Sequence, residues 1–255
     1  MTKVNIRGVL FDPVDMSEAV GVCRSLLQTD GAKVIHTPNS EIVQLCVKNP
    51  EYYEIINSAD LTIPDGAGVI MASKILGCPL EKGKVAGVEL MGELMALAAE
   101  TSSPVYLLGG RPASDGSPSV AEAAAENLKK RYPGLIIAGT RDGYFTDADT
   151  PSVIADINAS GAKLLCVCLG VPKQEKWTFE NRKALTSVRI AGCFGGSMDI
   201  YAGTATRAPK FWIDHNLEWA YRLLKEPKRI GRMMALPAFI LGCIGYRITH
   251  GKQKQ

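Results

Sequence analysis

One carboxylate in the sequence is placed as a catalytic base would be. Asp65 lies between Pro64 and Gly66, directly after the short apolar run Leu61–Ile63. A carboxylate at the end of a strand can accept a proton from a substrate hydroxyl as a general base. An aspartate in this position is also common as the N-cap of the following helix, so the local sequence leaves both roles open.

Glycine-rich and polar segments follow most of the other apolar runs. Segments of this kind expose backbone N–H groups at the start of a helix, where a phosphate group binds well. Each one alone is also explained as a tight turn between a strand and a helix. Six of them at one edge of a sheet favour a nucleotide or another phosphorylated ligand. These segments are Thr37–Ser40, Pro64–Gly68, Gly109–Arg111, Gly139 with Asp142–Phe145 downstream, Gly170–Glu175 and Phe194–Ser197.

Short β-branched and apolar runs are predicted to be the strands that position these segments. They alternate with stretches of helical periodicity, and turn residues separate the two kinds. This alternation predicts an α/β fold of the Rossmann-like type, with a mostly parallel sheet and helices on both faces. Ligands of such sheets bind beyond the carboxyl ends of the strands, where the glycine-rich segments lie. The predicted strands are Val4–Leu10, Lys33–His36, Leu61–Ile63, Val105–Leu108, Leu135–Ala138, Leu164–Leu169 and Val188–Ala191, and the predicted helices span 16–28, 40–48, 51–58, 67–76, 88–99, 119–131, 151–159 and 173–184.

The C-terminal part of the chain has a different charge. From Gly203 onward ten Lys and Arg residues face three acidic residues, a net charge of +7, whereas the first 202 residues carry −4. This asymmetry indicates an anionic partner for the tail, either a phospholipid surface or nucleic acid. The basic residues interleave with a long apolar run and not with stacked aromatic residues, which argues against nucleic acid.

Two segments of the tail carry apolar side chains. Pro209–Leu224 has the apolar stripe of one amphipathic helix. Met233–Tyr246 contains no charged residue and is interrupted by Pro237. It is too short to cross a bilayer, so it either packs on the main domain or lies in a bilayer interface. We therefore expect an α/β catalytic core over residues 1–195 and a membrane-associating appendage over residues 196–255.

Composition and missing motifs exclude several classes of protein. A hydrophobic fraction of 46% and a charged fraction of 22% exclude a disordered chain. The seven cysteines form no C-x-x-C pair and the N-terminus lacks an apolar signal segment, so we expect a protein of the reducing cytosol, neither exported nor transmembrane. Met71 occupies the third glycine position of a G-x-G-x-x-G pattern that begins at Gly66, which argues against a nicotinamide enzyme. No cofactor is expected.

A metal site is not expected either. The histidines are scattered along the chain and form no H-E-x-x-H pattern. Asp147 and Asp149 form a D-x-D pair, which holds a divalent cation in many sugar-nucleotide enzymes. Because the pair directly precedes Thr150-Pro151, we interpret it as the solvated start of a helix.

Several motifs, taken in order along the chain, match those of one enzyme family. They are Thr37-Pro-Asn39, Pro64-Asp-Gly66, Leu107-Leu-Gly-Gly110, Gly170-Val-Pro-Lys-Gln-Glu175, Gly195-Gly-Ser-Met-Asp199, Gly203, Arg207-Ala-Pro209, Leu217-Glu-Trp219 with Arg222-Leu, and Glu226-Pro-Lys-Arg229. In these motifs the chain resembles the WecG/TagA/CpsF glycosyltransferases from about residue 3 to 235. The resemblance is closest to the TagA branch, the N-acetylmannosaminyltransferases of wall teichoic acid synthesis.

The resemblance implies a reaction and its partners. It implies transfer of N-acetylmannosamine from UDP-ManNAc to the 4-hydroxyl of undecaprenyl-diphosphate-linked GlcNAc, with inversion and without a D-x-D metal site. It also implies a cytoplasmic enzyme, peripheral on the inner face of the cell membrane, that meets anionic lipid and no nucleic acid. The sequence leaves room for a homo-oligomer.

The resemblance also implies roles for individual residues. Asp65 matches the base, and Thr37 and Asn39 would position the acceptor or the donor sugar. Backbone N–H groups and arginines of the tail would bind the diphosphate. The further substrate-binding residues are Gly66, Gly109, Gly110, Gly143, Tyr144, Gly170, Pro172, Gln174, Glu175, Gly195, Gly196 and Asp199, with Arg207, Arg222 and Arg229 of the tail.

Other functions stay open at this point. The same fold could transfer another sugar, such as that of UDP-ManNAcA or UDP-Glc, because epimers differ at one hydroxyl that no motif identifies. A regulator that binds a sugar nucleotide without catalysis would keep the glycine-rich loops and need no base at Asp65. A nucleic-acid-binding α/β protein would use the basic tail alone. Acceptor-dependent release of UDP distinguishes the three.

Overall fold

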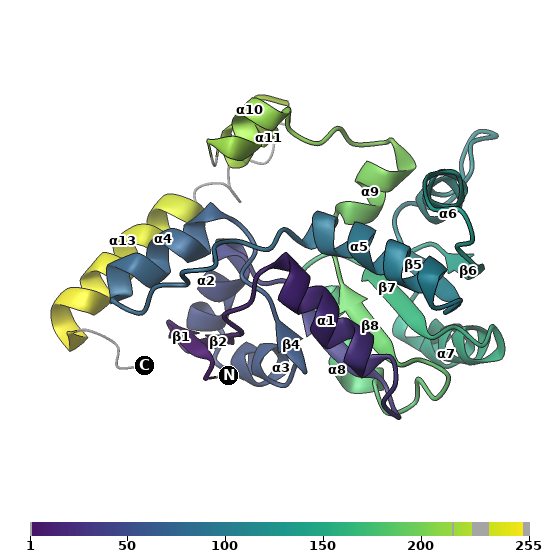
Figure 1. The fold of residues 1–255 in the computed structure, drawn as a ribbon, viewed down its shortest axis with the longest axis horizontal. Helices are drawn as coiled ribbons and strands as arrows, with labels where there is room; N and C mark the ends of the chain where they lie inside the picture. The colour runs from purple at the N-terminus through teal and green to yellow at the C-terminus, as the bar shows by residue number, and fades with distance from the viewer. Residues whose placement is uncertain (1, 216, 226–234, 252–255) are drawn as a thin grey trace.

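Parallel strands form the central sheet of the computed structural model, which describes residues 2–215, 217–225 and 235–251. The strands are β3 (Lys33–His36), β4 (Leu61–Thr62), β5 (Val105–Gly109), β6 (Ile137–Arg141), β7 (Leu164–Cys168) and β8 (Ile190–Cys193). They lie in the order β4-β3-β8-β7-β5-β6 (Figure 1), and every neighbouring pair is parallel. The predicted α/β fold is therefore confirmed.

Helices cover both faces of this sheet, as a buried parallel sheet requires. On one face lie α1 (Met16–Leu26), α5 (Gly87–Glu100), α6 (Val120–Arg131) and α9 (Ser197–Ala202), and on the other lie α7 (Thr150–Ala159) and α8 (Lys173–Asn181). Successive residues of β5 alternate between the two cores: Val105 and Leu107 pack with the first set, Tyr106 and Leu108 with the second. The predicted helices of this region are present, with ends within three residues of the prediction.

The N-terminal segment differs from the prediction of one strand over Val4–Leu10. It forms a separate antiparallel hairpin of β1 (Val4–Ile6) and β2 (Val9–Phe11). The turn residues Arg7 and Gly8 both have positive φ, at 53° and 93°, which matches the twist of a two-residue hairpin turn. The hairpin packs with α2 (Ser40–Lys48), α3 (Glu51–Asn57) and α4 (Ala67–Leu76) in a third apolar cluster.

The apolar segment of the tail forms a long helix, α13 (Ala235–His250), that lies along α4 in Figure 1. Phe239 and Cys243 are fully buried in the cluster of the hairpin, α2 and α4. The opposite side of α13 exposes Leu241, Ile244 and Ile248. Packing on the main domain is therefore observed for one face of this helix. Within the described residues, no helix has the length and hydropathy needed to cross a membrane.

The prediction of one helix over Pro209–Leu224 is wrong. The structure has two short helices, α10 (Lys210–Asp214) and α11 (Glu218–Lys225), which lie apart from the sheet (Figure 1). The N–H of Leu217 donates to the carbonyl of Trp212 at 2.7 Å, so the chain turns between the helices. Asp214 ends the first helix and His215 is its C-cap, and both residue types are among the weaker helix formers. The apolar stripe continues past this point, although the helix does not.

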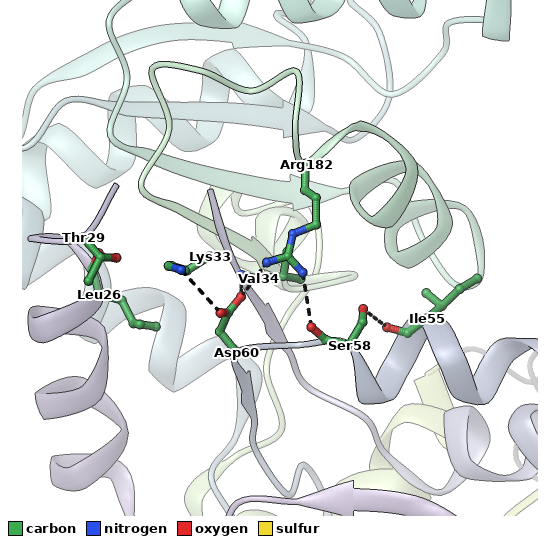
Figure 2. Close-up of polar contacts among 8 residues, drawn as sticks. All are labelled: Leu26, Thr29, Lys33, Val34, Ile55, Ser58, Asp60 and Arg182. Carbon is green, nitrogen blue, oxygen red and sulfur yellow. Dashed lines mark hydrogen bonds and ion pairs between the residues drawn. The ribbon is translucent and has the colours of Figure 1, made fainter. Parts of the chain in front are cut away.

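A polar network joins β3, β4 and α8 near the amino ends of the strands (Figure 2). The carboxylate of Asp60 accepts hydrogen bonds from the N–H of Val34 at 2.8 Å and from the guanidinium of Arg182 at 3.1 Å. Arg182 also donates to the carbonyl of Ser58 at 3.2 Å, and the ammonium of Lys33 lies 3.9 Å from Asp60. This network fixes the start of two strands whose other ends carry Thr37 and the segment of Asp65.

The unfolding free energy is expected to depend on pH through His36, a buried residue of β3. Burial disfavours the imidazolium and lowers the pKa of His36 from 6.5 to about 4. Between these pH values the unfolded chain binds one proton more than the folded chain, so acidification reduces stability by up to roughly 3 kcal/mol. His36→Leu should flatten the dependence of the unfolding midpoint on pH between these values. An unchanged slope, equal to that of a His215→Leu control at an exposed position, would contradict this.

Candidate active site

A cleft of about 390 Å³ opens at the carboxyl ends of β3, β4, β7 and β8. It brings together most of the site residues predicted from the sequence, namely Thr37, Asn39, Asp65, Gly110, Gly143, Tyr144, Gly170, Gln174, Gly195, Gly196 and Asp199. A second hollow of about 930 Å³ lies between α6, β6 and residues 113–118, and contains none of these. The first is the candidate site because loops after the parallel strands converge there.

Asp65 is held in the cleft by backbone contacts on both sides. Its N–H donates to the carbonyl of Pro38 at 3.3 Å, and the carbonyl of Pro64 accepts a hydrogen bond from the N–H of Val85 at 2.9 Å. The N-cap of α4 is Gly66 and not Asp65. Gly66 has a φ of 86°, which favours glycine, and it does not line the cleft. The N-cap interpretation of Asp65 is therefore wrong, and its carboxylate lines the cleft.

Thr37 and Asn39 each use one polar atom to hold the fold and keep another for a ligand. The hydroxyl of Thr37 donates to the carbonyl of Cys193 at 3.1 Å, so its oxygen can still accept a hydrogen bond from a ligand. The Oδ1 of Asn39 caps α2 by accepting from the N–H groups of Glu41 and Ile42, at 2.9 and 3.2 Å. Its Nδ2 is the group that it can offer to a substrate.

Gly87, the first residue of α5, is a part of the site that the sequence analysis missed. A Cβ at this position would lie 3.1 Å from Oγ1 of Thr37 and 3.4 Å from Oδ2 of Asp65. The hydroxyl of Thr37 and the carboxylate of Asp65 therefore approach one point above the Gly87 backbone. Gly87 does not directly follow a strand, because α5 begins after the long connection from α4, so the strand-end pattern does not include it.

An exposed aromatic ring lies at one edge of the cleft. Tyr144 is 71% exposed, and its N–H donates to the carboxylate of Asp142 at 2.8 Å. The ammonium of Lys173 holds the same loop by donating to the carbonyls of Gly143 and Phe145, each at 3.1 Å. It also lies 4.4 Å from the centre of the Phe145 ring. The loop thus presents a tyrosine ring that can stack on a flat ligand group.

Gly109, Pro172 and Glu175 lie outside the cleft lining. Gly109 has a φ of 136°, and a Cβ there would collide with the carbonyl oxygen of Cys168, so its role is close backbone packing. Pro172 follows a cis peptide bond and is the N-cap of α8. Glu175 is 1% exposed beneath the cleft. None of the three lines the cleft, in contrast to the prediction of direct substrate contact.

Arg207 is the one predicted arginine of the tail whose side chain the structure describes, and it does not line the cleft. Arg207 donates to the carboxylate of Glu89 in the first turn of α5, at 2.6 Å. Its Nε is buried and has no partner among the described residues. The side chain of Arg222 and the whole of Arg229 lie outside the described residues. Glu218 of α11 does line the cleft, so the tail reaches the site.

The D-x-D pair is the exposed start of a helix, as predicted. Asp147–Asp149 forms a single 3₁₀ turn that leads into α7. The carboxylate of Asp149 accepts hydrogen bonds from the N–H and the hydroxyl of Thr146, at 2.9 and 2.7 Å, which lowers its pKa. Across the part of the chain that the structure describes, no group of His, Cys, Asp and Glu side chains has the arrangement of a metal site.

Comparison with known proteins identifies the family. Residues 4–253 match the Glycosyl transferase WecG/TagA/CpsF family. The chain belongs to this family. It is 35% identical, over 99% of its length and 94% of the relative, to an N-acetylglucosaminyldiphosphoundecaprenol N-acetyl-beta-D-mannosaminyltransferase of Staphylococcus aureus (strain MW2). It is 35% identical, over 88% of its length and 83% of the relative, to the protein of that name from Bacillus spizizenii. In this WecG/TagA/CpsF member, residues of the Thr37-Pro-Asn39, Pro64-Asp-Gly66 and Gly195-Gly-Ser-Met-Asp199 motifs meet in the cleft.

A methyl group at Gly87 is expected to impair the site without unfolding the chain. In Gly87→Ala the Cβ would displace the side chain of Thr37 by a few tenths of an ångström and lie in van der Waals contact with Asp65, while helix propensity gains up to about 1 kcal/mol. We expect a loss of roughly tenfold in turnover with unchanged or higher melting temperature. Gly21→Ala in α1, where a Cβ meets nothing within 4 Å, is the matched control. Equal activity of both variants would contradict the placement of Gly87.

Proposed function

We propose that the protein is an inverting glycosyltransferase that moves N-acetylmannosamine from UDP-ManNAc to the 4-hydroxyl of undecaprenyl-diphosphate-linked GlcNAc. The names of relatives at 35% identity over nearly the whole chain support the two substrates. The observation that carries the chemistry is the approach of the Asp65 carboxylate and the Thr37 hydroxyl to one point in the cleft. A carboxylate so placed can accept the hydrogen of a substrate hydroxyl.

Inversion needs a single displacement at the anomeric carbon. In the proposed reaction Asp65 takes the proton of the acceptor hydroxyl as its oxygen forms a bond to that carbon. The bond from the anomeric carbon to the diphosphate oxygen breaks from the opposite side, and UDP leaves with the electron pair. Thr37 and Asn39 would orient the sugars through the atoms that the fold leaves available. Backbone N–H groups of the glycine-rich loops would stabilise the charge on the leaving diphosphate.

The direct test is Asp65→Asn, which keeps the shape of the side chain and removes the proton acceptor. Turnover of UDP-ManNAc with a lipid-diphosphate-GlcNAc acceptor should fall by about 10² to 10⁴. UDP binding, measured by calorimetry, should stay near that of the unmodified chain. Asp147→Asn, at an exposed position outside the cleft, is the matched control and should keep full activity.

Three outcomes of this assay distinguish the alternatives. If the activity of Asp65→Asn stays within threefold of that of the unmodified chain, Asp65 is not the general base. Acceptor-dependent UDP release from UDP-ManNAcA or UDP-Glc, and not from UDP-ManNAc, would keep the fold and mechanism but change the donor. UDP binding without any acceptor-dependent release would favour a regulator without catalysis.

We further propose that the segment from residue 196 onward is an appendage that brings the cleft to an anionic membrane surface on the cytoplasmic side. The exposed side of α13 supports this, with Leu241 68%, Ile244 40% and Ile248 78% exposed. The net charge of +7 after residue 202 is attracted by anionic lipids. Removal of the whole segment would also remove Phe239 and Cys243 from the core, so point variants are the cleaner test.

The variant Leu241→Asn/Ile248→Asn is expected to bind anionic liposomes at least roughly tenfold more weakly, because each apolar side chain contributes up to about 2 kcal/mol on burial. Co-sedimentation at low and high salt measures this, and salt should weaken binding of the unmodified chain. Ile136→Asn, 46% exposed at the far edge of the sheet, is the control. Turnover of a short-chain acceptor should survive in both. Equal sedimentation of both variants would contradict docking through α13.

A further inference from the structure

Glu175 is a buried carboxylate whose two oxygens both accept hydrogen bonds. The phenol of Tyr52 in α3 donates to Oε2 at 2.8 Å, and the side-chain amide of Gln174 donates to Oε1 at 2.7 Å. All three side chains are at most 4% exposed. Among the described residues that act on the charge of Glu175, none is a Lys or an Arg. Its charge is therefore met by hydrogen bonds alone.

The carboxylate determines the direction of every hydrogen bond in this group. A carboxylate only accepts, so the NH₂ of Gln174 must face Glu175 and its carbonyl oxygen must face the other way. That oxygen accepts a hydrogen bond from the backbone N–H of Gly195 at 3.0 Å. A flipped amide would place two donors against each other at Gly195. The chain of contacts thus runs from Tyr52 through Glu175 and Gln174 to Gly195.

Gly195 stands at the point where the backbone leaves β8 and enters the cleft. Its φ of 55° lies in the left-handed region, which is strained for other residues. Gln174, Gly195 and Gly196 line the cleft, whereas Tyr52 and Glu175 do not. The buried pair can therefore affect a ligand only through the residues that it orients.

We propose that Tyr52 and Glu175 are positioning residues, which fix the Gln174 amide and through it hold the Gly195–Gly196 turn in its substrate-binding position. This rests on the proposed function, because the turn is taken to contact the UDP-sugar. A buried carboxylate is costly, and an apolar pair of similar volume would serve packing alone as well or better. The free-energy cost of burying Glu175 is explained if the function of its carboxylate is to orient the amide of Gln174. Burial raises the pKa of Glu175, while the hydrogen bonds from Gln174 and Tyr52 oppose the rise.

The first experiment compares two tyrosines on one helix. Tyr52→Phe removes the donor to Glu175, whereas Tyr53→Phe removes the donor to the Arg7 carbonyl, a contact of 2.7 Å outside the cleft. Each variant loses one hydrogen bond, and the drop in melting temperature is expected to be larger for Tyr52→Phe, because this variant leaves a buried carboxylate with one donor fewer. Only Tyr52→Phe should lower kcat/KM for the donor, by roughly tenfold. The KM for the acceptor should change less than twofold in both. Equal kinetics of the two variants would overturn the proposal.

The second experiment exchanges the carboxylate and the amide. Gln174→Glu places two carboxylates against each other and should lower kcat/KM by at least about a hundredfold. In the double variant Gln174→Glu/Glu175→Gln each donor again meets an acceptor. In this double variant the carboxylate at position 174 would accept hydrogen bonds from the N–H of Gly195 and from the amide NH₂ at position 175. The carbonyl oxygen of the amide at position 175 would accept the hydrogen bond from the hydroxyl of Tyr52. Recovery of at least roughly tenfold over Gln174→Glu is expected. No recovery in a double variant with normal melting temperature would overturn the proposal.

A readout without substrate separates this proposal from the proposed function. The amide resonance of Gly195 and its hydrogen-exchange rate should change in Tyr52→Phe and not in Tyr53→Phe. If the unmodified protein transfers no sugar from a UDP-sugar, the proposed function is wrong. The Gly195 amide would still show whether the hydrogen bonds from Tyr52 through Glu175 and Gln174 position the turn. An unchanged Gly195 amide in Tyr52→Phe would remove the positioning role even in an active enzyme.

Discussion

The turn after β8 is anchored from two sides, and the geometry of the cleft depends on this anchoring. The carbonyl of Cys193 accepts the hydroxyl hydrogen of Thr37, and the N–H of Gly195 donates to Gln174. The first bond joins the turn to β3 and the second joins it to α8. Because β8, β3 and β4 are adjacent in the sheet, the same anchoring relates the glycine turn to Asp65 at the end of β4.

Polar residues buried beneath the cleft are a cost that the apolar core must offset. His36 is buried on β3 with a lowered pKa, and the carboxylate of Glu175 is buried on α8. Each would destabilise the fold if it were charged and unpaired. Burial keeps His36 neutral, and two donors satisfy Glu175. Both are direct sequence neighbours of cleft residues, Thr37 and Gln174, so each buried group acts on the cleft through the residue beside it.

Much of the fold could be predicted from local pattern, because buried parallel strands and amphipathic helices have distinct periodicities. The hairpin at the N-terminus was missed, because the two-residue turn Arg7–Gly8 between the two apolar runs lacks the Asn or Asp that marks most turns of this type. The loop residues of the cleft were found because they follow strands. Gly87 was missed because it follows no strand, and the burial of Glu175 was missed because its partner Tyr52 is 123 residues away in sequence. Long-range contacts of this kind leave no local signal.

Helix α5 links the tail to the carboxylate of Asp65. Its first residue, Gly87, lies against Asp65 and Thr37, and the carbonyl of the next residue, Val88, accepts a hydrogen bond from the hydroxyl of Tyr201 at 2.8 Å. Glu89, in the same turn, pairs with Arg207. The segment that follows β8 is thus attached to the turn of helix that borders Asp65. A shift of this segment would move the start of α5, and with it the surroundings of Asp65, so the tail is part of the framework of the cleft.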